Sequence, residues 1–107
     1  MKTSHTQKYT LLKAEDSFNT YINALNNTFR DLENNVILDL TAIETQEEEI
    51  KLLETFANIQ TKKNKSFVVV LSAFDADTFE EKLNVVPTLT EAEDIIDMEE
   101  MERDLGF

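Results

Sequence analysis

The side chains in this sequence that could best take part in catalysis or bind a ligand are carboxylates, together with one histidine. Transition-metal sites and activated nucleophiles usually depend on histidine or cysteine, but the chain has no cysteine and only His5. Metal centres, thiol nucleophiles and histidine-based triads therefore lack the residues that they need. Glycine-rich phosphate loops are excluded in the same way, because Gly106 is the only glycine. We expect no metal, no cofactor and no catalytic residue.

Asp39 is the best candidate for a reactive carboxylate. It follows the apolar residues 36–38, so we expect it at the end of a buried strand, and Glu15 and Asp16 follow the first expected strand. Acids at strand ends resemble those of a response-regulator receiver, with Asp39 as phosphoacceptor. The spacing differs, because only one helix separates the two acidic positions and no lysine follows the later strand at residues 72–75. A phosphoacceptor role for Asp39 stays an alternative hypothesis.

Two clusters of acids are more prominent than Asp39. The first opens an expected helix at residues 45–50, where carboxylates suit the positive end of the helix dipole. The second lies in residues 90–104, where eight acids accompany a single arginine. Such clusters either bind a basic partner or form a solvated surface. The candidate partner-binding residues are Thr45, Glu47, Glu48, Glu49, Glu99, Glu100 and Glu102.

The whole chain is strongly acidic, with a formal net charge of −12 over 107 residues. This charge argues against nucleic acid as a partner, because phosphate binding needs a basic surface. It argues equally against an anionic membrane surface, and no apolar run is long enough to cross a bilayer. The first seven residues have no apolar stretch typical of a signal peptide. We therefore expect a cytoplasmic protein whose partner is another protein with a basic face.

Hydrophobic periodicity predicts one α/β domain in residues 8–107, preceded by a flexible segment, residues 1–7. Apolar runs without alternation indicate strands buried on both faces, hence a small, mostly parallel sheet of about four strands with alternating helices. The lysines in the first strand favour an edge position for it. The expected strands are 8–14, 35–41, 67–71 and 85–86, and the expected helices are 18–32, 46–62, a short one with Phe79 and Leu83, and one from about Thr90.

Polar residues at characteristic spacing predict where the helices begin. Ser17 is expected to cap the first helix. A hydroxyl or Asp followed three residues later by Glu is typical of a capping box, in which each residue binds the other's backbone N–H. The capping boxes that we expect are Thr45 with Glu48, Asp77 with Glu80, and Thr90 with Glu93.

The last helix loses its apolar face along its length. The apolar residues among 92–96 are expected to face the core, whereas only scattered ones follow. This end of the helix is expected to project past the core. The surface around Met98, Met101 and Leu105, or the open edge of the first strand, would then suit a structural homodimer, which is a further alternative.

The order of elements and several local patterns resemble a STAS domain, the fold of anti-sigma factor antagonists. In that family a buried strand ends with D-L-S/T, as residues 39–41 (D-L-T) do here. A short loop then leads to a helix start with D-S-S/T-G and a phosphorylatable hydroxyl. The family's last helix opens with T/S-x-x-E-A, which compares with Pro87–Glu93. The resemblance covers roughly residues 8–97 and implies a non-enzymatic regulatory domain that binds a protein.

This sequence departs from the family at the phosphorylated position. That position falls on or near residues 47–50, which contain neither a hydroxyl nor a glycine, and the nearest hydroxyl belongs to Thr45. Either the switch is lost and the acids are only solvated, or Glu48 or Glu49 sets a permanent negative charge where a phosphoserine would stand.

The stretch from Val85 to the end is also similar to the tail of small bacterial STAS-like proteins, some of which are labelled ribonuclease Z. A nuclease of the metallo-β-lactamase fold needs an H-x-H-x-D-H cluster, which a single histidine cannot build. A role beside such an enzyme stays open. The sequence therefore predicts a non-enzymatic, STAS-like interaction domain.

Overall fold

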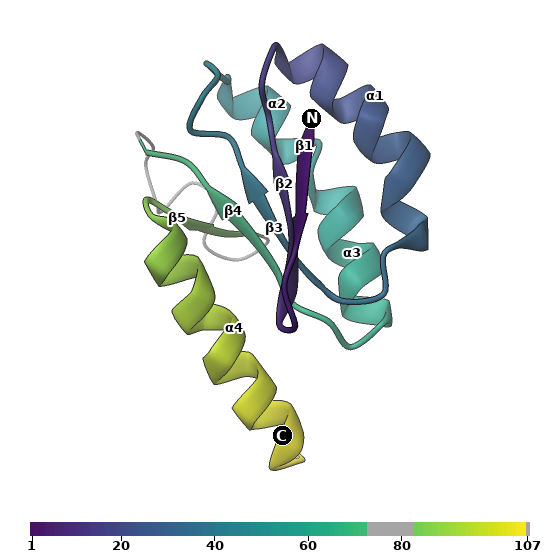
Figure 1. Cartoon of the computed structure of the whole chain (residues 1–107), viewed down its shortest axis with the longest axis vertical. Coiled ribbons are helices and arrows are strands. Elements are labelled where there is room, and N and C mark those ends of the chain that lie inside the picture. Colours follow the sequence, from purple (N-terminus) through teal and green to yellow (C-terminus); the bar gives the residue numbers. More distant parts are fainter. Residues whose placement is uncertain (73–82, 107) are drawn as a thin grey trace.

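The computed structural model describes residues 1–72 and 83–106, and its centre is a five-stranded sheet with helices on both faces (Figure 1). This arrangement confirms the predicted α/β class. The strands are β1 (Lys2–His5), β2 (Tyr9–Lys13), β3 (Asn35–Asp39), β4 (Phe67–Val70) and β5 (Asn84–Val86). The helices are α1 (Phe18–Thr28), the 3-10 turn η1 (Phe29–Asp31), α2 (Glu47–Lys51), α3 (Glu54–Lys62) and α4 (Leu89–Asp104).

The sheet is mixed, with the strand order β1-β2-β3-β4-β5. Strand β1 runs antiparallel to β2, and each of the other neighbouring pairs is parallel. A mostly parallel sheet of about four strands is therefore not what forms. The prediction of a flexible segment at residues 1–7 is wrong, since Lys2–His5 forms β1. The predicted edge position of the next strand is wrong too, because β1 covers that edge.

A tight turn explains why the polar start of the chain forms a strand. The Thr6 hydroxyl accepts hydrogen bonds from the N–H groups of Lys8 and Tyr9, at 3.2 and 3.0 Å. This turn brings β1 back along β2, with Lys2 opposite Lys13. All four residues of β1 are exposed, so its stability comes from pairing rather than from burial. Hydrophobic periodicity cannot detect a strand of this kind.

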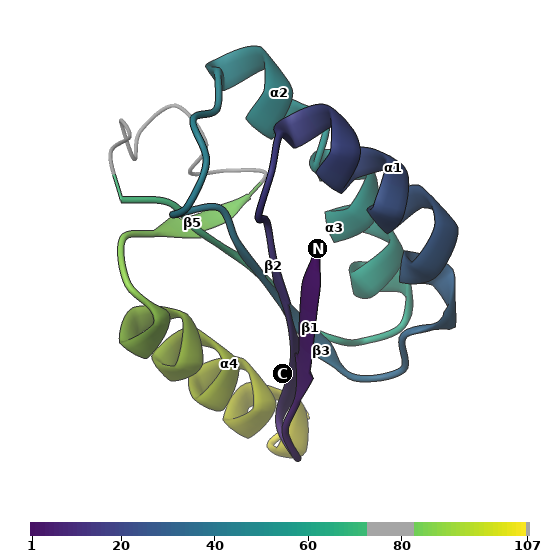
Figure 2. The same ribbon diagram turned by 45° about the horizontal axis from the view of Figure 1, so that its top comes forward.

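The helices that the structure describes are divided unequally between the two faces of the sheet. Helices α1, α2 and α3 lie on one face, and α4 lies on the other (Figure 2). Alternation along β3 places Val36 and Leu38 in the larger core under α1–α3, and Ile37 in the smaller core under α4. All three are fully buried. The unbroken apolar run in the sequence is therefore that of a strand between two helical layers.

The predicted helix over residues 46–62 is interrupted, and α2 and α3 replace it. Backbone bonds of the 3-10 type join Leu53 N–H to the Ile50 carbonyl and Phe56 N–H to the Leu53 carbonyl, both at 3.0 Å. A 3-10 turn repeats every three residues, so it aligns side chains that are three apart. Ile50, Leu53 and Phe56 all enter the larger core, whereas Leu52 is left 58% exposed.

The predicted start of α1 is correct, and that of α2 is one residue early. The Ser17 hydroxyl accepts a hydrogen bond from Thr20 N–H at 3.2 Å, as an N-cap does. At α2 the N-cap is Gln46, whose N–H donates to the Glu49 carboxylate at 2.8 Å. The predicted box of Thr45 with Glu48 is therefore wrong.

The start of α4 also differs from the prediction. Its N-cap is Thr88, whose hydroxyl accepts from Glu91 N–H at 3.2 Å and donates to the Glu91 carboxylate at 3.0 Å. The predicted box of Thr90 with Glu93 is wrong, because a pair with the same spacing stands two residues earlier. The expected box of Asp77 with Glu80, and the short helix with Phe79, fall outside the described residues apart from Leu83.

Candidate functional site

The two predicted acidic clusters lie at opposite ends of β3 and on opposite faces of the sheet. Residues 45–49 follow the C-terminal end of β3, and the next residue, Ile50, belongs to the larger core. Glu100 of α4 instead approaches Asn35, the first residue of β3, on the face with the smaller core. A strand of five residues spans about 13 Å. The structure therefore does not bring the two clusters together on one surface.

In the first cluster, two of the carboxylates already have partners within their own helix. The Glu49 carboxylate holds the N–H of Gln46, and Glu47 lies 3.5 Å from Lys51 in an exposed ion pair. Thr45 is half-buried and Glu48 is exposed. Because the Glu49 side chain closes its own helix, its charge is directed toward the backbone rather than toward solvent. Glu48 is the acid of this cluster that is best placed to meet a partner.

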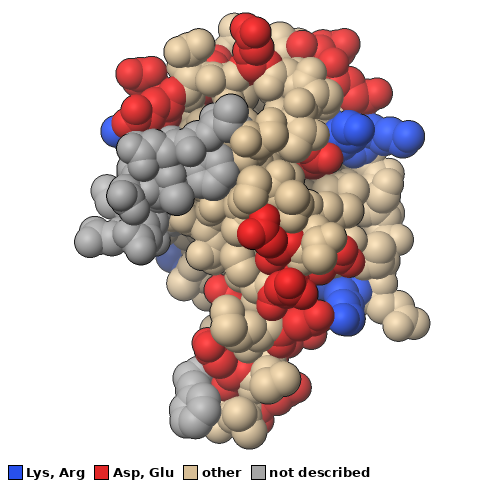
Figure 3. All heavy atoms as spheres, turned by 90° about the vertical axis from the view of Figure 1, so that its left-hand side faces the viewer, with Lys and Arg blue, Asp and Glu red and all other residues tan. Residues whose placement is uncertain are grey.

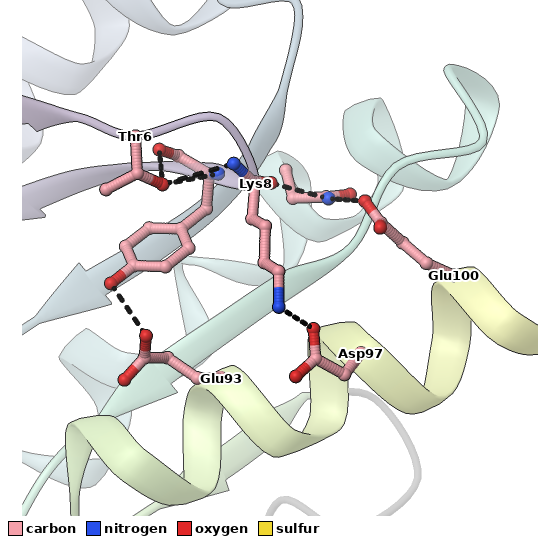
Figure 4. Close-up of polar contacts among 7 residues, drawn as sticks. Thr6, Lys8, Glu93, Asp97 and Glu100 are labelled. Carbon is pink, nitrogen blue, oxygen red and sulfur yellow. Dashed lines mark hydrogen bonds and ion pairs between the residues drawn. The ribbon is translucent and has the colours of Figure 1, made fainter.

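In the second cluster, a row of acids on α4 faces the sheet (Figure 4). The row has spacings of four and three residues, which keep it on one side of the helix. Three groups donate to these acids: the phenol of Tyr9 in β2, the ammonium of Lys8 in the turn before β2, and the side-chain amide of Asn35 in β3. The contacts are Tyr9 Oη to Glu93 at 3.2 Å, Lys8 Nζ to Asp97 at 2.7 Å, and Asn35 Nδ2 to Glu100 at 2.6 Å.

The same acids raise the pKa values of two of their partners, Lys8 and Tyr9. The hydrogen bond to Asp97 is the main cause that raises the pKa of Lys8 above its ordinary value. Burial is the main cause that raises the pKa of Tyr9, and the charge of Glu93 adds to it. The Lys8–Asp97 pair is exposed on both sides, so solvent screens it and it contributes little to stability.

Asn35 is a residue whose role sequence reasoning missed. It is fully buried, and its Oδ1 accepts from Ser66 N–H at 2.8 Å and from the Arg103 guanidinium at 3.3 Å. Its Nδ2 donates to the Lys8 carbonyl at 2.8 Å as well as to Glu100. One amide thus connects β3 to the residue before β2, the residue before β4, and α4. The signal in the sequence is a polar residue directly before the apolar residues 36–38, at the start of the expected strand.

Glu99 and Glu102 lie beside cations of the chain itself. They line a pocket of about 260 Å³ together with Thr61, Asn64, Lys65 and Arg103. Two acids and two cations share this pocket, so its charges largely offset one another. Glu99 and Glu100 are half-buried, and Glu102 is exposed. Of the three predicted residues on α4, Glu102 is therefore the most accessible to a partner.

Further acids of α4 face solvent. Glu91, Asp94 and Asp104 are exposed along the helix, and only Arg103 adds a positive charge to it. The Arg103 guanidinium is directed to neutral acceptors, the Asn35 amide and the Ser66 hydroxyl. Figure 3 shows this side of the molecule, with acidic side chains over its lower half, where α4 lies, and others along its top. The outward surface of α4 is therefore strongly negative.

Asp39 has a structural role at the end of β3. Its Oδ1 accepts from the Thr41 N–H at 2.9 Å and from the Thr41 hydroxyl at 2.7 Å, which shapes the turn after the strand. The carboxylate is half-buried. Within residues 1–72 and 83–106, no three His, Cys, Asp or Glu side chains are grouped so that they could hold a metal ion. His5 lies in β1, with Nδ1 3.2 Å from the Thr10 hydroxyl.

Comparisons with known proteins give no further guide. No protein-family model matches the chain, and a search among curated proteins finds no match either. Among the helices of the described residues, none has the length and apolar character needed to cross a membrane.

Proposed function

We propose that this chain is a non-enzymatic, STAS-like interaction domain that binds a basic protein partner through the outward surface of α4. The observation that supports this most directly is the charge of that helix, which has eight acids and one arginine. The arginine faces the sheet, whereas Asp94, Glu102 and Asp104 are exposed. A surface of one sign steers oppositely charged partners and favours them over others.

The order of elements supports the STAS-like part of the proposal. Strands and helices alternate from β2 to β4, and β5 and α4 close the chain, in the order on which the resemblance rests. The D-L-T pattern stands at the end of β3. Because residues 47–50 offer no hydroxyl, the proposed regulation works without phosphorylation at that helix start. Its proposed place of action is the cytoplasm.

The test compares the two acidic clusters by neutralising each in turn. One variant has Asp94→Asn and Glu102→Gln on α4, and the matched control, which also loses two charges, has Glu47→Gln and Glu48→Gln on α2. Each protein is immobilised and exposed to native lysate at about 50 and about 300 mM NaCl, conditions that differ in screening length. Bound proteins are identified by mass spectrometry.

We expect the wild type to retain a basic protein at the lower salt concentration and to lose it at the higher one. The α4 variant should fail to retain that protein, and the α2 control should retain it. Capture that is insensitive to salt, or equal capture by both variants, would contradict the proposed surface. If only the α2 variant fails to retain the basic protein, the partner binds at the start of α2, at Glu47 and Glu48.

A further inference from the structure

The outward face of α4 combines its acids with large apolar side chains. Met98, Met101 and Leu105 are 55%, 63% and 65% exposed. Spacings of three and four residues place them in one line along the helix. The helix buries a different face, through Ala92 and Ile96, in the smaller core. We call Met98, Met101 and Leu105 the apolar stripe of α4.

Acids lie beside the apolar stripe along its length. Asp94 stands four residues before Met98, and Glu102 four residues after it. In the same way, Asp97 and Asp104 lie four residues before and three residues after Met101. Residues three or four apart are neighbours on a helix surface, so each methionine has a carboxylate one turn away in both directions.

We infer that the apolar stripe binds an amphipathic helix of the partner, one whose apolar side chains cover the methionines and whose Lys or Arg residues meet the flanking acids. This inference rests on the proposed function and names the kind of partner. A straight stripe over two helical turns matches the side-chain ridge of a facing helix. Methionine is flexible and polarisable, which suits such a contact.

Charge complementarity favours a basic amphipathic helix over a second copy of the chain or a membrane surface as the binding partner of the apolar stripe. A second copy of the chain would set the acids around one stripe against the acids around the other, and like charges across an interface oppose binding. An anionic membrane surface would repel them in the same way. A helix with basic flanks satisfies both the apolar and the charged parts of the face.

The test uses three fluorescein-labelled peptides of about 18 residues, long enough for five helical turns. The first has a leucine face flanked by lysines, the second is a scrambled sequence of the same composition, and the third has glutamate in place of lysine. Binding to the full chain is measured by fluorescence anisotropy. We expect the first peptide to bind most tightly and to bind more weakly as salt is added.

Matched variants separate the apolar stripe from the acids. Met98→Gln with Met101→Gln removes apolar surface and keeps the charge, and Leu52→Gln does the same at a side chain on α2's end that is 58% exposed. We expect the first variant to bind the leucine–lysine peptide at least about tenfold more weakly, as for the loss of an interface anchor. The Leu52→Gln variant should bind it as the wild type does. Far-UV circular dichroism and melting temperature confirm that both variants fold.

Each contrary outcome is distinct. Equal binding of the scrambled peptide, or no effect of the methionine substitutions, would overturn the inference while the basic partner of the proposed function stands. If no peptide binds although the lysate protein is still captured, the inference is again wrong and the proposed function is not. If light scattering finds a wild-type dimer that the methionine variant loses, a second copy covers the stripe and the inference fails.

Discussion

Tyr21 shows how one side chain in the larger core combines packing with a polar contact. Its position in the periodic pattern of α1 predicts burial, and only 1% of it is exposed. The hydroxyl donates to the Leu12 carbonyl at 2.6 Å, so the core holds a phenol whose polar atom is satisfied. Burial is the main cause that raises its pKa, and the nearby charge of Asp39 adds to it.

We expect this shift to make the protein less stable in alkaline solution. A group with a raised pKa in the fold stabilises it fully below the ordinary pKa, here 10.0, and this stability is lost as the pH rises toward the folded value. The loss is about 1.4 kcal/mol for each pH unit in that range. Urea unfolding at about pH 8 and about pH 11 should show a smaller decrease for Tyr21→Phe than for the wild type. Equal decreases would contradict it.

At the scale of elements, the start of α2 shows why a cap matters for a short helix. Helix α2 has five residues and forms few backbone bonds of its own, so the bond from Gln46 N–H to the Glu49 carboxylate is a large part of its local stabilisation. The same bond limits the idea that Glu49 mimics a phosphoserine, since this carboxylate already has a partner within its own helix.

We expect Glu49→Ala to lower the free energy of unfolding by about 1 kcal/mol, the usual effect of a lost N-terminal cap. Glu48→Ala is the matched control, because it removes a charge from the same helix end without removing the bond, and its effect should stay within about 0.5 kcal/mol. Urea denaturation followed by circular dichroism measures both. Equal effects would mean that the dipole interaction, not the cap, stabilises α2.

For the whole molecule, the polar junction at Asn35 complements the two apolar cores. Helix α4 packs on the sheet through the smaller core, and its far end is held by polar contacts from Glu100 and Arg103 to Asn35. The sequence pattern led us to expect this end to project past the core. Glu100 and Arg103 tie the helix to the start of β3, and the ribbon of α4 continues past the sheet at its C-terminal end (Figure 1), while the apolar stripe stays in solvent.

We expect Asn35→Ala to lower the free energy of unfolding by about 2–4 kcal/mol, because it leaves the buried Ser66 N–H and the Glu100 carboxylate without their partner and removes one of the two acceptors of Arg103. Asn26→Ala is the control, since Asn26 is exposed on α1. Its effect should be within about 0.5 kcal/mol. Chemical denaturation measures both variants. A loss for Asn35→Ala that is no larger than for Asn26→Ala would show that water replaces the amide.

The sequence by itself determined the elements whose burial pattern is local. The apolar runs in β3 and β4, the helical spacing that begins at Phe18 with its Ser17 cap, and the short β5 before Pro87 were all predicted, because each depends on neighbouring residues. The two acidic clusters were also evident from the order of residues in the sequence.

Only the tertiary structure decided which distant residues meet. Pairing with β2 makes a strand of the polar residues 2–5, and alignment of Ile50, Leu53 and Phe56 on the larger core divides one predicted helix into two. The polar contacts of Asn35 and the separation of the acidic clusters by the sheet depend on residues tens of positions apart. Such contacts form because folding brings several distant segments together at once. Local periodicity depends only on neighbouring residues, so it cannot predict which distant residues meet.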